Sequence, residues 1–170
     1  MLPRRAVLRS VLAIAVFGQP AAGLAQPPFG WSATPSAVDD YQRAAVFLRQ
    51  GSLDEAAYGF HRGQLRLRIC LLAHPEEPVG QGRALFSAFQ EVIGRPVNEY
   101  AFGDIHELVE VHDQVLAWHA ANDDPFVPKA QYPAAHQQAR AGLEKLCSQV
   151  IAERDQIHEQ RTKNRLPNRT

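Results

Sequence analysis

The segment from Ser52 to Ala73 constrains the fold more than any other part of the chain. It opens with SLDE, in which Ser52 and Glu55 can satisfy each other's backbone N–H groups as a capping box, and it stops before HPEEP. Between these limits, apolar residues at helical spacing form stripes on two opposite sides. A helix that is apolar on both sides belongs in the middle of a bundle. Gly59 and Gly63 would let a neighbouring helix approach it closely.

Apolar residues recur at helical spacing along most of the remaining chain. No stretch alternates with period two for long enough to predict a strand. We expect Ser36 to cap the first helix and Gly94 and Pro96 to stop the third. The expected helices cover residues 36–50, 52–73, 83–93, 104–121 and 134–161. The sequence therefore predicts an all-α protein, a single-domain irregular bundle of about five helices within residues 36–161.

Residues 1–25 have the three-part layout of a cleavable secretory signal. Three arginines precede seven apolar residues at 11–17, a run too short to cross a bilayer, and small residues precede Gln26. The stretch RRAVLR resembles a twin-arginine export signal, although Pro3 stands where that pattern prefers Ser or Thr. The twin-arginine and general routes both stay open. We expect a periplasmic or secreted protein with no transmembrane segment after cleavage, beginning with an extended lead-in at 26–35.

The charge balance argues against a nucleic-acid partner. Without residues 1–25, the remaining 145 residues carry 15 Lys and Arg against 18 Asp and Glu. Nucleic-acid binders need a cationic field to engage phosphates. The basic tail at 162–170 could touch an anionic surface, but a solvated end is the favoured interpretation.

Residues 40–67 resemble one tetratricopeptide-like helix hairpin. The stretch GSLDEAAYGFHRGQL has a glycine at the turn, small Ala56, aromatic Tyr58 and Phe60, and small Gly63 where that repeat places them. No second copy follows at the repeat spacing of about 34 residues. The resemblance therefore implies shared hairpin packing, without the peptide groove of a repeat array.

The expected fourth helix, DIHELVEVHDQVLAWHA, carries histidines on two faces. His112 and His119 share the apolar face, whereas His106, Glu110 and Asp113 point the other way. A solvated surface explains the outward group better than a metal site does. Buried imidazoles need partners, so the inward pair is either hydrogen-bonded in the core or lines a pocket, where a metal is possible. His106 and His112 are six residues apart, so the helix lacks the zinc-protease spacing.

Two polar lines interrupt the apolar surface of the second helix: His61, Gln64 and Arg68, and separately Arg62 and Arg66. We expect the second line to face solvent. An arginine held in a bundle interior usually meets a carboxylate, of the protein or of a ligand. Glu91 and Glu99 are the candidate partners for Arg68, in an internal salt bridge or a ligand site.

The segment GRPVNEYAFGD is the strongest candidate for a binding loop. Its glycines, Pro96 and Asp104 account for the end of one helix and the start of the next. They leave four residues unexplained: Asn98, Glu99, Tyr100 and Phe102. Binding groups concentrate on loops that a rigid scaffold holds.

The sequence contains two cysteines, Cys70 and Cys147, which either form a disulfide or remain as buried thiols. An even count in an exported chain favours a disulfide, whereas buried thiols are also common in helical cores. Neither belongs to a haem-attachment motif, and a cysteine inside a packed helix is a poor nucleophile.

These features favour an exported interaction protein that binds a protein partner or a small ligand in the cell envelope, without catalysis or cofactor. It could be an inhibitor, an immunity-type protein or an accessory subunit. The alternative is a metal- or cofactor-binding bundle or a hydrolase, with His61, His112 and His119 as ligands and Glu99 as a base.

Overall fold

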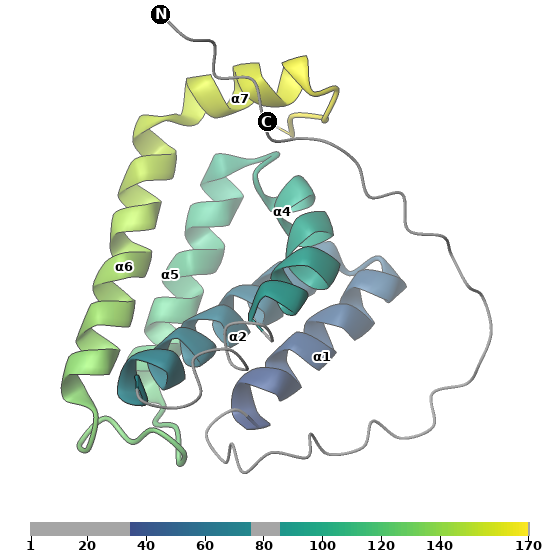
Figure 1. The fold of residues 1–170 in the computed structure, drawn as a ribbon. Coiled ribbons are helices and arrows are strands. Elements are labelled where there is room, and N and C mark those ends of the chain that lie inside the picture. The colour runs from purple at the N-terminus through teal and green to yellow at the C-terminus, as the bar shows by residue number, and fades with distance from the viewer. Residues whose placement is uncertain (1–34, 76–85, 170) are drawn as a thin grey trace, which may run out of the picture. The chain divides into compact units, whose positions relative to one another are not determined.

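A computed structural model describes residues 35–75 and 86–169 (Figure 1). The signal at 1–25 and the lead-in up to residue 34 lie outside these residues. The elements are α1 (Pro35–Gln50), α2 (Leu53–Ala73), a π-helical turn η1 (Gln90–Gly94), α4 (Arg95–Ala101), α5 (Ile105–Ala121), α6 (Pro133–Ala152) and α7 (Arg154–Lys163). The described part of the chain contains no strand, which confirms the predicted all-α bundle. Within the same ranges, no helix combines the length and apolarity that a bilayer span requires.

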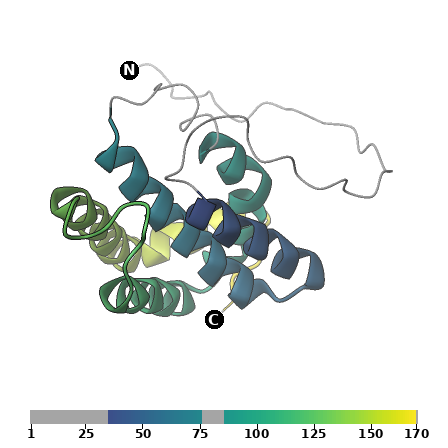
Figure 2. The same cartoon turned by 90° about the horizontal axis from the view of Figure 1, so that it is seen from below.

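Helix α2 is the central element, as its two apolar faces predict. It contacts α1, α4, α5 and α6 (Figures 1 and 2). The turn before it places Gly51 at φ +79°, where a side chain would be strained. A Cβ on Gly63 would lie 3.2 Å from both the carbonyl oxygen of Ala37 and the Cβ of Asp40. The predicted close approach at this glycine is therefore made by α1.

The helix starts agree only partly with the sequence. Asp104 caps α5 as predicted, with its Oδ1 accepting from the N–H groups of His106 at 2.9 Å and Glu107 at 3.1 Å. The expected capping box is wrong, because the side chain of Ser52 makes no capping hydrogen bond. The Ser36 cap is wrong too, because α1 already begins at Pro35. Proline suits a first helical turn, where its missing N–H would have had no partner.

The predicted stop at Gly94 and Pro96 is wrong, because the chain stays helical from residue 86 to Ala101. The N–H of Arg95 reaches back to the carbonyl of Gln90, the wider spacing of a π turn. This local widening lets the helix pass Pro96, which has no N–H to donate. A Cβ on Gly94 would lie 2.6 Å from Cζ of Phe60. Because glycine has no Cβ, the π turn can pack closely against α2 at this point.

The expected last helix is two helices, because the chain bends at Glu153 between α6 and α7 (Figure 1). The bend brings partly buried Ile157 against the core and buries Arg161. A straight continuation of α6 would carry both side chains away. Most of the described tail is exposed, but its last described residue is tied to the body, since the N–H of Arg169 donates to the carbonyl of Gly103 at 2.7 Å.

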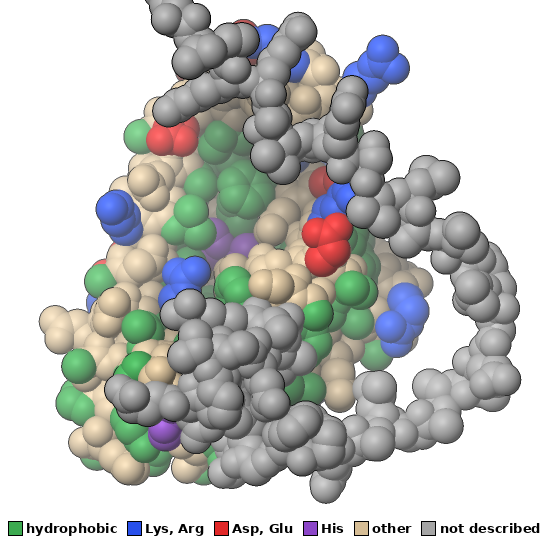
Figure 3. All heavy atoms as spheres, in the orientation of Figure 1, with side chains coloured by type: hydrophobic (Ala, Val, Ile, Leu, Met, Phe, Trp, Pro, Cys, Tyr) green, Lys and Arg blue, Asp and Glu red, His purple; other side chains and the backbone are tan. Residues whose placement is uncertain are grey.

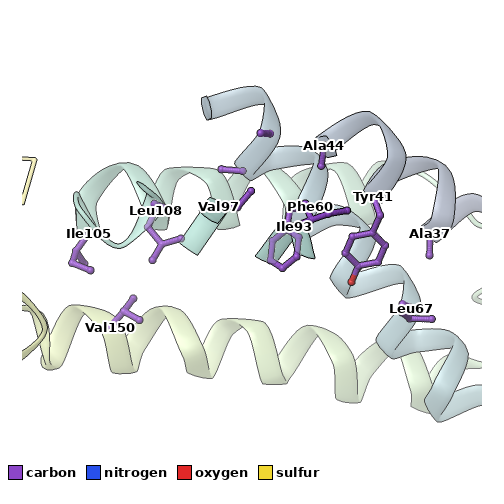
Figure 4. Packing of buried hydrophobic residues seen from close by; sticks show 13 residues of the cluster. Ala37, Tyr41, Ala44, Phe60, Leu67, Ile93, Val97, Ile105, Leu108 and Val150 are labelled. Atoms are coloured by element: carbon purple, nitrogen blue, oxygen red, sulfur yellow. The ribbon is translucent and has the colours of Figure 1, made fainter. Parts of the chain in front are cut away.

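Buried apolar side chains form two clusters. The first packs α1 and α2 against η1, α4, α5 and α6, with Tyr41 edge-on to Phe60 and with Val97 and Leu108 further along the same cluster (Figure 4). The second fills the space between α2, α5 and α6 and includes Leu65, Val115 and Leu143. Together these clusters fix α2 and α5, the two helices that supply most of the polar groups discussed below.

Candidate functional site

Most of the predicted binding loop is helix α4, with Phe102 as its C-cap, and the four candidate side chains lie on two faces of this segment. The Tyr100 hydroxyl donates to Oδ1 of Asp54 on α2 at 2.7 Å. Asn98, Glu99 and Phe102 instead face α7, with which they line a groove of about 480 Å³. The four residues therefore do not form one site.

The polar line His61, Gln64 and Arg68 does not form one site either. His61 is buried, Gln64 is partly buried and Arg68 is exposed. The carboxylates expected to meet Arg68 both lie beside Arg95, with Glu99 at 3.3 Å and Glu91 at 4.0 Å. The expected internal salt bridge of Arg68 with Glu91 or Glu99 is therefore wrong.

The interior arginines are those of the other line, which corrects the expectation that Arg62 and Arg66 face solvent. Both contact the fully buried carboxylate of Asp40, with Nη1 of Arg66 at 3.0 Å from Oδ2. Nε of Arg66 also lies 2.9 Å from Oδ2 of Asp124. The ring of Trp118 lies about 5 Å from both guanidinium carbons. The network ties α1, α2, α5 and the loop after α5 together.

One signal for this network was present in the sequence. Asp40 falls on the same face of the first helix as Ala37, Tyr41 and Ala44, and all four are buried. A carboxylate on an apolar face needs a cationic partner. Choosing Arg62 and Arg66 over other arginines required the helix packing, because the partners lie 22 or more residues apart.

A groove of about 620 Å³ runs between α1, α2 and α5; we name it the charged groove. Its lining residues are Arg43, Phe47, Asp54, Glu55, Tyr58, Gly59, Arg62, Glu107, Glu110, Val111 and Gln114. A hollow of about 260 Å³ shares Arg43 and Arg62 with it and adds Ser36, Asp39, Asp40, Arg66 and Trp118.

Charges of opposite sign occupy opposite ends of the charged groove. The acidic end has Asp54 and Glu55 from the first turn of α2, with Glu107 and Glu110 from the start of α5. Two turns along α2, Arg62 marks the arginine end, together with Arg43 from α1. Arg62 is paired with the buried carboxylate of Asp40, so Arg43 is the cation that this end offers to a partner. Eight residues of helix separate Asp54 from Arg62, which places the two ends about 12 Å apart. Between them lie the partly buried side chains of Phe47, Tyr58 and Val111.

The inward histidines of α5 are buried, as predicted, but they have different partners. Nε2 of His112 lies 3.4 Å from Nδ1 of His61, and Nδ1 of His112 lies 3.4 Å from Sγ of Cys147. Nε2 of His119 lies 2.8 Å from Nδ1 of His136, whose own Nε2 donates to the Val127 carbonyl at 2.7 Å. Because a carbonyl only accepts, Nε2 of His136 carries a proton, and its Nδ1 accepts from Nε2 of His119.

Burial keeps these imidazoles neutral. Desolvation, together with the neighbouring His112, lowers the pKa of His61 to about 3. Desolvation also lowers the pKa of His112 and that of His119 to about 4. Only small patches of histidine are visible on the face drawn in Figure 3, between apolar side chains.

This arrangement gives little support to the alternative in which His61, His112 and His119 are metal ligands. His61 and His112 are neighbours, but His119 is paired with His136 elsewhere. Among residues 35–75 and 86–169, no group of three or more His, Cys, Asp or Glu side chains is placed to hold a metal ion.

Cys70 and Cys147 do not form a disulfide, so that alternative is wrong and the buried-thiol alternative describes both residues. Cys70 packs in the second apolar cluster, whereas Cys147 lies against His112. Burial raises the pKa of Cys70 to about 12 and also raises the pKa of Cys147. Thiols held in this protonated form are poor nucleophiles.

Comparisons with family models, with curated proteins and with solved structures each found no match to this chain.

Proposed function

We propose that the protein is an exported binding protein of the cell envelope and that its charged groove holds a short segment of a partner protein. The observation that carries this proposal is the separation of carboxylates and arginines to opposite ends of one groove. Complementary charges fix the orientation of a bound partner and speed its association. The apolar side chains between the ends would pack against the middle of the bound segment.

The length of the groove defines the chemistry of the partner. An extended chain advances about 3.3 Å per residue, so about 12 Å corresponds to three or four residues. We therefore expect a segment with a basic side chain at one position and an acidic side chain three or four positions away. The basic side chain would lie at the acidic end, and the acidic side chain near Arg43.

The binding proposal is tested with one labelled pentapeptide, acetylated and amidated, of sequence Arg-Ala-Val-Ala-Glu. Fluorescence anisotropy should show saturable binding to the full mature protein. Arg43→Glu should weaken binding about tenfold, because it replaces an attractive charge with a repulsive one. Arg49→Glu is the matched control, since Arg49 lies on the same helix, is exposed and does not line the groove. An equal loss in both variants would show that the effect is not local to the groove.

The export proposal rests on the layout of residues 1–25. Intact-mass measurement of the protein recovered from the periplasm should give a chain that begins at Gln26. An unprocessed chain found only in the cytoplasm would contradict it.

A further inference from the structure

Glu107, at the acidic end of the charged groove, already binds a guanidinium group of this chain, which lies beside the groove and is not one of its lining residues. Nη1 of Arg169 lies 2.7 Å from Oε2 of Glu107, and its guanidinium carbon lies 3.6 Å from the centroid of the Tyr100 ring. The hydroxyl of that ring is fixed by Asp54 at 2.7 Å. An aromatic face beside a carboxylate is a favourable setting for a guanidinium group. Asp54, Tyr100 and Glu107 therefore form a subsite for arginine.

The contacts of the Arg169 guanidinium group leave one of its donors unsatisfied and place it near another cation. Its Nε is buried and has no acceptor among the described residues, which costs free energy. Its guanidinium also lies close to that of Arg161, since a Cβ on Gly103 would be 3.3 Å from Nε of Arg169 and 3.2 Å from Nη2 of Arg161. Burial, together with the charge of Arg169, lowers the pKa of Arg161. Release of Arg169 would relieve both the unsatisfied donor and the repulsion.

Arg161 anchors the rest of the tail independently of Arg169. Its Nη2 donates to the carbonyls of Glu99 at 2.8 Å and Pro167 at 2.6 Å, and its Nε donates to Oδ1 of Asn168 at 3.2 Å. The Arg169 side chain can therefore leave the subsite while the preceding tail and the bond from the Arg169 N–H to the Gly103 carbonyl stay in place. The groove beyond the subsite keeps two further carboxylates, Glu55 and Glu110, for an incoming cation.

From these contacts we infer that Arg169 is an internal stand-in for a partner's arginine and must be displaced when the partner binds. The inference rests on the proposed function, because it names the group that the acidic end of the same groove recognises. The tail would then lower the apparent affinity by the fraction of molecules in which Arg169 fills the subsite.

The test compares binding of the same pentapeptide to wild type, Arg169→Ala and Arg165→Ala. Arg169→Ala should bind about tenfold more tightly, because no tail arginine competes. Arg165→Ala, which changes an exposed arginine of the same tail, should bind as wild type does. A pentapeptide with neutral citrulline in place of arginine should bind weakly to all three proteins.

A second readout follows Arg169 itself. In ¹⁵N-labelled wild type, the Nε–H signal of Arg169 should move to the position of a free arginine when the pentapeptide is added. The citrulline peptide should leave this signal unchanged. A merely structural tail contact would not respond to the two peptides differently.

The outcomes separate the two proposals. Equal affinity of wild type and Arg169→Ala would overturn the role of the tail while the groove remained a peptide site. No binding to either protein would overturn the proposed function and the inference with it. Tighter binding by Arg169→Ala, with no gain from Arg165→Ala, would support both.

Discussion

At the residue scale, several predictions made from residue type are wrong because the outcome depends on contacts between individual atoms. Gly94 has the sequence context of a helix stop, yet it lies in a continuous helix with φ −65°. What matters there is the missing Cβ, which leaves room for the ring of Phe60. Similarly, Arg62 and Arg66 differ from exposed Arg68 in meeting buried carboxylates and the ring of Trp118. Neither the contact of Gly94 with Phe60 nor the burial of Arg62 and Arg66 can be predicted without knowing which helices pack together.

The role of Gly94 leads to a prediction about Gly94→Ala. Alanine suits the helical backbone better than glycine does, but its Cβ would lie 2.6 Å from Phe60. Overpacking of this kind typically costs more than the gain in propensity, so we expect a loss of about 2 kcal/mol in the free energy of unfolding. Urea unfolding measures it.

Gly142→Ala is the matched control for that variant. Gly142 is also helical, and a Cβ on it would lie 3.5 Å from Nη1 of Arg68, the end of a flexible and exposed side chain. We expect a gain of up to about 1 kcal/mol there. If Gly94→Ala stabilised the protein as much as Gly142→Ala, the close packing of η1 on α2 would be refuted.

At the scale of elements, the sequence predicted the helices whose signals are local. Helices α2 and α5 have the expected bounds to within one residue, because long apolar periodicity and the Asp104 cap define them. The segment 94–101 was predicted as a loop because glycine and proline usually end helices, and a π turn that accommodates both has no local signature.

The wrong prediction of a loop at this segment led to the wrong prediction of a single binding site on it. A loop at 94–103 would present Asn98, Glu99 and Tyr100 together, whereas a helix separates them by its own geometry. The predicted burial of His112 and His119 was confirmed, because helical periodicity alone determines which face they share. Their partners, Cys147 and His136, lie on α6, and only the packing of α6 against α5 identifies them.

At the scale of the whole molecule, α2, α5 and α6 share a core that is sensitive to acid. His61, His112 and His119 lie between these helices, and burial lowers the pKa of each below the ordinary value of 6.5. In the unfolded chain their pKa returns to about that value. Between about pH 4 and 6.5 the unfolded chain therefore binds protons that the folded chain does not.

The sign of the pH effect follows from this difference in bound protons. The free energy of unfolding rises with pH wherever the unfolded state binds more protons. The stabilisation is present in full above about pH 6.5 and is lost progressively as the pH falls towards 4. One pKa unit corresponds to about 1.4 kcal/mol, so a buried imidazole such as His112 accounts for a loss of about 2 kcal/mol between pH 6.5 and 5.

Urea titrations at pH 7, 6 and 5 test this prediction, and the unfolding midpoint should fall at each step. His112→Asn removes one titrating imidazole, so the variant should be less stable at pH 7 but show a shallower decline with acid. A wild-type midpoint that stays constant from pH 7 to pH 5 would mean that the three imidazoles are not held neutral between α2, α5 and α6. A decline equally steep in His112→Asn would assign the acid sensitivity to other groups.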